Sequence, residues 1–431
     1  MSTPVLRRLL ALAVPVLVTT LTACARADAP STSHPVIDDS AGVQIVRNGT
    51  IGIWGPDTPR IEQLVRIGAV EGEEAYQFHQ IYSLAMDAEG MLYVGNSQTA
   101  SVRVFRPDGS FVREFGRKGR GPGEYSMINR VWLAGDSIGV TDWQGGGKTG
   151  IYTKQGELIA FWTARRPDRT RILPQAKTPS GWLAFPVDFG NVPALDTGER
   201  WVRDQPLVRF DPEADSVGPP NVLVPGQVLY GSPDTHGLDW ALFAPNPAHG
   251  FDAAGRTYVS PGDPYRIEVF DDEGRLVRVI SREYDPVPLD DRDVAELKAL
   301  IDATYDTVRR ATGRQERESA LTRVDHQRSY DPRTTVAPLG NLLVSPAGSF
   351  WVERVDAAGP AAIEYEKLYG DFDGRPRPTR WDLFDADGRF LAGVDLPATF
   401  RPLAVRGTDV AGVLRDEMDV EYVVVYRVGP P

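Results

Sequence analysis

A short glycine-containing pattern recurs along the chain and limits the folds that the chain can form. In Met86–Asn96, Phe251–Pro261 and Val344–Arg354, the end of an apolar segment is followed by polar or small residues, a glycine and an alternating apolar segment. Glycine readily adopts the positive φ that a tight turn between antiparallel strands requires. Each copy therefore predicts a β-hairpin.

A second kind of hairpin recurs beside the first. This second pattern occurs in the segments "VRVFRPDGSFVREFG", "GIYTKQGELIAFW", "RIEVFDDEGRLVRVI" and "WDLFDADGRFLAGVDL". Their turn glycines are Gly109, Gly156, Gly274 and Gly388. Gly90 and Gly109 are 19 residues apart, and so are Gly255 and Gly274. The regular spacing indicates two hairpins in series, which form one four-stranded antiparallel unit.

The chain contains six such units, and none can bury both of its faces alone, so the units must stack. They span residues 81–116, 129–163, 175–225, 246–281, 335–395 and 401–428. The last unit supplies only three strands. Its missing outer strand is predicted at Arg60–Gly68, so that the two ends of the chain share one unit and close a ring with only short sheet edges.

The glycine-rich phrase "FGRKGRGPGEY", Phe115–Tyr125, resembles the connection between successive blades of NHL-repeat β-propellers. Arg66–Phe78 is a degenerate second copy, in which Ile67-Gly68 and Gly72-Glu73 match the same pattern. The chain is thus identified as an all-β, six-bladed β-propeller of the NHL-repeat type over nearly all of its mature length. A phosphate-binding loop would need a helix after it, whereas strands are predicted on both sides here.

The N-terminus resembles that of a bacterial lipoprotein. Arg7 and Arg8 precede an apolar run that ends in Leu21-Thr22-Ala23-Cys24, which matches the lipobox. The resemblance implies a signal peptide over 1–23, a lipid on Cys24, a tether over 24–41 and the propeller over 42–431. An ordinary signal peptide with a chance cysteine is the alternative. We expect a protein of the bacterial cell envelope, held on the periplasmic or outer-surface face.

Composition excludes several classes of protein. Cys24 is the only cysteine, so no disulfide forms within the chain. Removing Arg7 and Arg8 with the signal takes the net charge from −12 to −14, which argues against binding nucleic acid through its phosphates. No later segment approaches the ~20 apolar residues needed to span a bilayer. The lipid is therefore the only predicted membrane attachment.

The predicted insertions gather at one end of the blades. The two hairpin turns of each blade lie at the end with short turns, whereas the blade-to-blade crossings and the middle loops lie at the opposite end, called here the long-loop face. The insertions are Asp188–Gln205, Tyr230–Pro245, Tyr284–Arg333 and Val352–Pro378. Within the third, Val294, Leu297, Ile301, Tyr305 and Val308 recur at helical spacing. We expect a helical insertion at about 290–330 between blades four and five, capped by Asp290, with a second helix from about Gln315 to Val324, lying over the ring as a partial lid.

Loops on a rigid scaffold commonly carry function, so binding is expected on the long-loop face. The candidates are residues near the starts of inner strands and the ends of second strands. They are Arg130, Asp142, Trp143, Asn246, His249, Tyr265, Arg266, Arg333, Glu353 and Arg354. Each has a structural alternative: Asn246 and Asp142 are as well suited to holding their own loops, and charged rim residues are often only solvated.

Three functions remain open from the sequence. The first is a propeller that binds an envelope protein, a peptide or a small-molecule ligand. The second is a calcium-dependent lactonase, arylesterase or lyase, because oxygen ligands suit calcium and Asn129, Asp142, Asn246 and Glu353 could supply them. The third is carbohydrate recognition, with Trp143, Trp240 and Trp381 as stacking surfaces. No catalytic motif is present, and no cofactor is certain.

Overall fold

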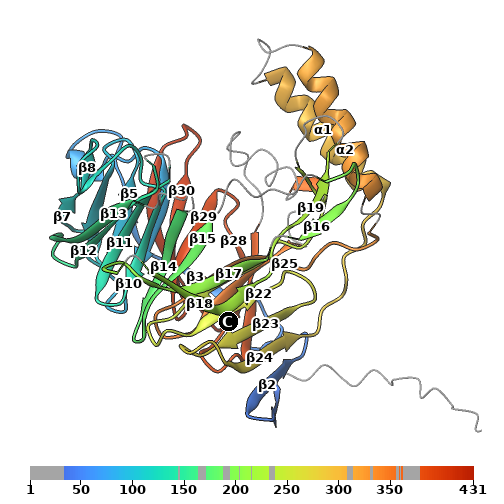
Figure 1. Ribbon diagram of the computed structural model, residues 1–431, viewed down its shortest axis with the longest axis horizontal. Helices are drawn as coiled ribbons and strands as arrows, with labels where there is room; N and C mark the ends of the chain where they lie inside the picture. The colour runs from blue at the N-terminus through green and yellow to red at the C-terminus, as the bar shows by residue number, and fades with distance from the viewer. Residues whose placement is uncertain are drawn as a thin grey trace, which may run out of the picture. The chain divides into compact units, whose positions relative to one another are not determined.

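The computed structural model describes residues 34–143, 146–163, 171–187, 195–202, 204–214, 216–232, 238–307, 314–330, 333–355, 359, 361–362 and 379–431. Six antiparallel sheets built on four strands confirm the predicted six-bladed β-propeller (Figure 1). The predicted signal peptide and Cys24 lie outside the described residues.

Each of the first five blades takes its four strands in chain order, from the inner strand to the outer strand. Blade one has β4 (Ile81–Met86), β5 (Leu92–Asn96), β6 (Ser101–Phe105) and β7 (Phe111–Phe115), and blade two has β10 (Arg130–Ala134), β11 (Ser137–Asp142), β12 (Lys148–Thr153) and β13 (Leu158–Thr163). Blade three has β14 (Arg171–Thr178), β15 (Gly181–Val187), β17 (Gln205–Asp211) and β18 (Ser216–Val224). Blade four has β21 (Ala248–Phe251), β22 (Thr257–Ser260), β23 (Arg266–Phe270) and β24 (Leu276–Arg282), and blade five has β25 (Leu339–Val344), β26 (Phe350–Arg354), β27 (Thr379–Phe384) and β28 (Phe390–Leu396).

The sixth blade joins the two ends of the chain. It contains β29 (Phe400–Arg406), β30 (Asp409–Arg415), β31 (Glu421–Gly429) and, as its outer strand, β3 (Arg60–Ile67). β3 pairs antiparallel with β31 from Arg60 opposite Gly429 to Ile67 opposite Val423. Inner strand β29 lies against both β4 and β25. The predicted closure of the ring is therefore confirmed.

The hairpin turns share one construction. In blade one the amide of Gly90 donates to the carbonyl of Asp87 over 3.0 Å, and Gly90 has a φ of 85°. The Asp87 carboxylate also accepts the amide N–H groups of Glu89 and Met91. The same pattern repeats at Asp252, Asp271 and Asp385. "DDEG" is thus a hairpin turn, as its sequence predicted.

The glycine-rich phrase of blade one is the expected crossing between blades. It leads from β7 to β10 through β8 (Arg117–Lys118) and β9 (Glu124–Tyr125), which pair in parallel. The Glu124 carboxylate accepts the amide N–H groups of Arg120 and Gly121 at 2.9 and 2.8 Å. These bonds lower the pKa of Glu124 below its usual range, the bond from Gly121 most. The amide N–H groups of Arg120 and Gly121 thus bond to a carboxylate of the same crossing, in the way that a phosphate-binding loop would bond to a phosphate.

The hydrophobic core lies between neighbouring blades. Tyr265 and Ile267 of blade four pack with Leu342 and Val352 of blade five, and all four are buried. Blades one and two share a similar cluster. Burial of apolar surface between blades is the main favourable term available to a chain without an internal disulfide.

The N-terminal boundary of the propeller differs from the prediction. The prediction places residues 36–41 in the tether, but β1 (Val36–Ser40) and β2 (Val43–Asn48) form a hairpin through Ala41 and Gly42, both at positive φ. β2 pairs in parallel with β24 and makes blade four a six-stranded sheet. The parallel pairing of β2 with β24 joins segments that are far apart in the sequence, so no local pattern predicts it.

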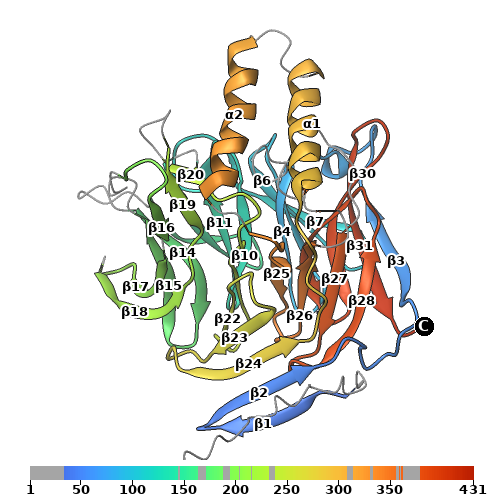
Figure 2. The ribbon, with the colours of Figure 1, turned by 90° about the vertical axis from the view of Figure 1, so that its right-hand side faces the viewer.

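The helical insertion consists of α1 (Asp291–Thr307) and α2 (Arg314–Tyr330). Figure 2 shows the two helices standing on end above the strands, so the expectation that they lie over the ring as a lid is wrong. Apolar residues of both helices pack on the crossing into blade four: Leu297, Ile301 and Val324 share one buried cluster with Leu242 and Phe243.

Two predicted insertions also pair with each other. β16 (Arg200–Val202), from the middle of blade three, pairs with β19 (Val228–Gly231), which pairs with β20 (Leu238–Trp240). The Val352–Pro378 insertion lies mostly outside the described residues.

Candidate functional site

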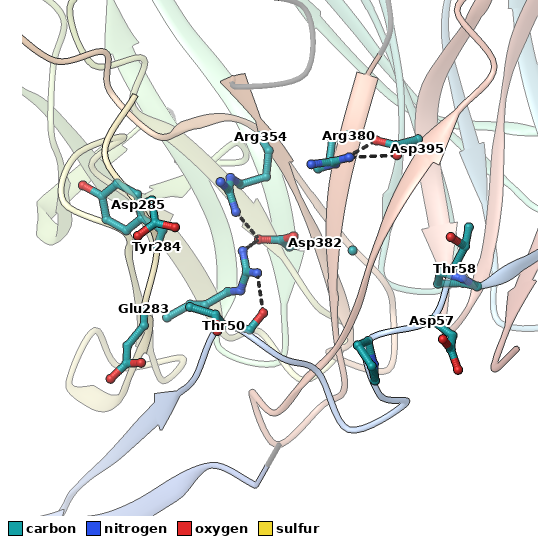
Figure 3. Close-up of a pocket in the computed structure, with 14 residues that line it drawn as sticks. Thr50, Asp57, Thr58, Glu283, Tyr284, Asp285, Arg354, Arg380, Asp382 and Asp395 are labelled. Carbon is teal, nitrogen blue, oxygen red and sulfur yellow. Dashed lines mark hydrogen bonds and ion pairs between the residues drawn. The ribbon is translucent and has the colours of Figure 1, made fainter. Parts of the chain in front are cut away.

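A polar pocket lies between blades four and five, at the long-loop ends of their strands (Figure 3). Its volume is about 350 Å³. Blade four supplies the end of β24, and blade five supplies the end of β26, the start of β27 and the end of β28. The segment between β2 and β3 forms the remaining wall. The lining residues are Thr50, Pro56, Asp57, Thr58, Pro59, Arg282, Glu283, Tyr284, Asp285, Arg354, Arg380, Asp382, Gly393 and Asp395.

The floor of the pocket is a buried ionic network around Asp382, whose side chain is 1% exposed. Its Oδ2 accepts from Arg282 Nη1 at 2.6 Å and from the Tyr265 hydroxyl at 2.5 Å, and Arg354 Nη1 lies 3.5 Å away. The Arg282 guanidinium also stacks on Phe390, 4.1 Å from the ring centroid. Burial, followed by the Asp382 charge, raises the pKa of Tyr265 well above its usual value. Tyr265 therefore serves as a neutral donor that helps to fix the carboxylate.

One wall carries a second, more exposed ion pair. Arg380 donates through Nε and Nη2 to the two carboxylate oxygens of Asp395, at 2.7 and 2.9 Å. Gly393 lies on the same strand as Asp395. A Cβ at Gly393 would meet only Asp382 Oδ1, at 3.3 Å. The absence of a side chain at Gly393 thus leaves room above the floor.

The opposite wall is held in place from the end of β2. Asn48 is 4% exposed and donates to the carbonyls of Ser281 in blade four and Gly388 in blade five. Its own Oδ1 accepts the amide N–H of Phe390. Arg282 Nη2 donates to the Thr50 carbonyl at 2.9 Å, which ties this segment directly to the pocket floor.

Two predicted residues, Arg130 and His249, lie on the inner strands of blades two and four. Arg130 Nη1 donates to Gln175 Oε1 at 2.7 Å, and burial lowers the pKa of Arg130 to about 10. His249 packs edge-on against Phe185 and Phe251. Burial, with a smaller contribution from the Arg130 charge, lowers the pKa of His249 to about 4. His249 is therefore a neutral packing residue at pH 7.

The predicted calcium ligands are engaged in different local bonds. The Asp142 carboxylate accepts the Ser126 amide at 2.6 Å, and Asn129 Oδ1 accepts the Trp143 amide at 2.8 Å. Asn246 bonds to Gln227 at 3.2 Å, and Glu353 accepts from both nitrogens of Asn341. Within the described part of the chain, no group of three or more His, Cys, Asp or Glu residues is placed to hold a metal.

The remaining candidates divide between the pocket and other places. Arg354 lines the pocket, and Tyr265 lies behind it. Arg266 pairs with Glu268 at 2.5 Å, and the Arg333 carbonyl accepts from Arg328. Trp381 is 2% exposed and belongs to the core between blades five and six, so its expected role as a stacking surface is wrong. The side chain of Trp240 lies outside the described part.

Sequence reasoning missed Arg282, Arg380, Asp382 and Asp395. Most of the candidates lie near the starts of inner strands and the ends of second strands, and Arg266 alone begins a third strand. The starts of third strands and the ends of outer strands reach the same face. Arg282 ends an outer strand and Arg380 begins a third strand. Applying the same rule to all four strands would have found both arginines.

Fold and site together define a six-bladed β-propeller with a charged pocket between two blades. A model of the DUF5128 family, described as a 6-bladed beta-propeller, matches residues 69–146. The crystal structure of a DUF4221 family member from Bacteroides vulgatus is similar, with a TM-score of 0.52 and 10% identity over 87% of this chain and 99% of that one. These similarities concern the fold; the NHL-repeat type stays a prediction.

Other similar structures differ in function. Virginiamycin B lyase from Staphylococcus aureus has a TM-score of 0.39 and 9% identity over 86% of this chain and 99% of that one. An aldose sugar dehydrogenase from Streptomyces coelicolor has a TM-score of 0.36 and 12% identity over 86% and 99%. No curated protein matches in sequence. None of the helices in the described residues is long and apolar enough to cross a membrane.

Proposed function

We propose that this propeller is a binding module of the bacterial cell envelope that takes up a small polar ligand in the pocket between blades four and five. The observation that carries the proposal is the pocket itself: about 350 Å³ of space at the long-loop ends of two blades. Its volume falls at the lower end of the range for small-molecule sites, about 300–1,000 Å³.

The lining indicates the character of the ligand. Most of the lining residues are charged or polar, and Tyr284 is the one aromatic residue among those described there. An apolar ligand would leave the charged groups desolvated without partners, which is costly. A polar ligand that replaces water at these groups suits the site better, so lactones and aryl esters are poor candidates.

The same lining favours binding over hydrolysis. Among its described residues there is no histidine, serine or cysteine to act as nucleophile or neutral-pH base. Asp382 is fixed by three donors in the floor. A residue held in this way supports the shape and charge of the site.

Binding can be tested with a variant that fills the pocket and leaves its charges in place. Gly393→Leu extends a side chain toward Asp382, and Gly429→Leu is the control, because a Cβ there meets nothing within 4 Å. The mature chain and both variants are screened by calorimetry against a panel of amino acids, organic acids and sugars. We expect at least one ligand to bind the mature chain and the control but not Gly393→Leu. Equal binding by all three proteins would rule out the pocket.

The proposed anchoring has its own test. Cys24→Ser in the full-length protein should move it from the membrane fraction to the soluble fraction after cell lysis, because one thiol would carry the lipid. Retention of the variant in the membrane fraction would contradict the lipid anchor without bearing on the pocket.

A further inference from the structure

The positive charges of the pocket are matched by carboxylates of the pocket itself. Arg282 and Arg354 contact Asp382 in the floor, and Arg380 pairs with Asp395 on one wall. Every arginine of the lining thus has a carboxylate partner inside the pocket. The whole lining contains five carboxylates and three arginines, which gives a formal charge of −2. An anion that enters the pocket therefore meets more negative than positive charge.

The outer part of the pocket is acidic. The carboxylates of Asp57, Glu283 and Asp285 line it, and all three residues are exposed. Within the described part of the chain, no side-chain hydrogen bond or ion pair engages these three carboxylates. Figure 3 shows Asp285 and Asp57 on opposite sides of the pocket. A cation that enters the pocket therefore meets negative groups on both sides.

Tyr284 adds an aromatic surface next to these carboxylates. It lines the pocket and is half-buried, and its ring lies 5.9 Å from the ring of Tyr265. Burial, followed by the charge of Asp263, raises the pKa of Tyr284, so the phenol is neutral at pH 7. The face of a neutral aromatic ring attracts an organic cation. The ring thus favours the same sign of ligand charge as the carboxylates do.

The backbone fixes the start of this wall. The amide N–H of Glu283 donates to the Asn48 carbonyl at 2.9 Å. The preceding residue, Arg282, donates to Asp382 at 2.6 Å. Tyr284 follows directly in the sequence. Groups that are held in place before a ligand arrives lose less freedom on binding, which favours affinity.

We propose that the pocket binds a small organic cation, an aliphatic amine, with one ammonium group beside Tyr284 and Asp285. This inference rests on the proposed function and names the ligand class of the same pocket. An ammonium group donates three hydrogen bonds and accepts none, so it suits carboxylates that have no other donor. A second ammonium group would face Asp57 across the pocket. A ligand with two amino groups therefore matches the formal charge of the lining best.

The test is calorimetric titration of the mature chain with three four-carbon molecules, 1,4-diaminobutane, 1,4-butanediol and succinate. They have similar lengths and differ mainly in the charge of their ends. We expect 1,4-diaminobutane to bind saturably and the other two to bind at least tenfold more weakly. Binding of the diamine should weaken as the salt concentration rises, because salt screens charges that are exposed to solvent.

Three variants locate the bound cation. Asp285→Asn should weaken binding of 1,4-diaminobutane about fivefold, the upper end for an ion pair that is open to solvent. Tyr284→Leu should weaken it about threefold, because the aromatic ring is lost while an apolar side chain remains. Gly393→Leu should prevent binding. Asp136→Asn is the matched control, because it removes the same charge from an exposed turn between β10 and β11, at the short-turn end of blade two.

Each outcome bears on the ligand class or on its location. Equal or tighter binding of succinate or 1,4-butanediol overturns the ligand class, and so does calcium chloride if calcium displaces the diamine. Diamine binding that is unchanged in both Asp285→Asn and Tyr284→Leu, or that weakens equally in Asp136→Asn, overturns the location. If the diamine does not bind but a neutral molecule from the wider panel does, and Gly393→Leu prevents it, this inference fails while the proposed function stands.

Discussion

Arg282 Nη1 lies 2.6 Å from Asp382 Oδ2, and this contact joins blade four to blade five across 100 residues of sequence. Both side chains are buried, at 10% and 1% exposure. The pair thus connects the two blades and forms part of the pocket floor. Breaking this ion pair should therefore lower both the stability of the protein and its affinity for a ligand in the pocket.

Asp382→Asn should destabilise the protein by about 3–5 kcal/mol, because it leaves buried arginines without their carboxylate. Urea unfolding of the mature chain measures the change. Asp395→Asn is the control: its pair with Arg380 is exposed, and such pairs contribute about 0–1 kcal/mol. Equal losses in the two variants would show that the buried network does not stabilise the interface between blades.

Gly274→Ala should lower the melting temperature more than Gly42→Ala. The two glycines have nearly the same positive φ, 81° and 82°. A Cβ at Gly274 would lie 2.2 Å from the backbone oxygen of Asn221, whereas a Cβ at Gly42 meets nothing within 4 Å. The difference between the variants isolates the steric clash from the cost of positive φ. Similar melting temperatures would contradict the tight contact between blades three and four.

Acid should weaken the fold through His249. Its pKa is about 4 in the folded protein against 6.5 as the usual value, so the unfolded state binds the proton first as the pH falls. This contribution to stability is complete above pH 6.5 and is lost as the pH falls toward 4, by at most about 1.4 kcal/mol per pH unit. The free energy of unfolding at pH 7 and pH 5 should differ less in His249→Gln than in the unaltered protein. An unchanged difference would mean that His249 is protonated as easily in the folded state.

Calcium should not change the melting temperature of the mature chain relative to EDTA. Asn129, Asp142, Asn246 and Glu353 are engaged in separate bonds and would have to leave them to share an ion. A ligand that binds only the folded state stabilises it by about 2.7 kcal/mol at a hundred times its dissociation constant. A clear upward shift in melting temperature with calcium would restore the calcium-dependent enzyme as a candidate.

The sequence alone determined the blades, because their information is local. Turn signals such as Asp87-Gly90 and Asp271-Gly274 specify a hairpin through bonds within a few residues, and strand alternation specifies the buried face. The closing strand at Arg60–Ile67 could be predicted because a four-stranded unit lacked one member. The helix over Asp291–Thr307 could also be predicted from local information, because its apolar residues recur at helical spacing.

Tertiary structure decided what lies between the blades. The addition of β2 to blade four, the upright helices and the pairing of Arg282 with Asp382 all depend on contacts between segments far apart in the chain. A charged residue at the end of a strand has the same local pattern whether it meets solvent or a partner in the next blade. Arg282 and Arg380 therefore gained their place in a pocket only when the packing of blades four and five brought their strand ends together.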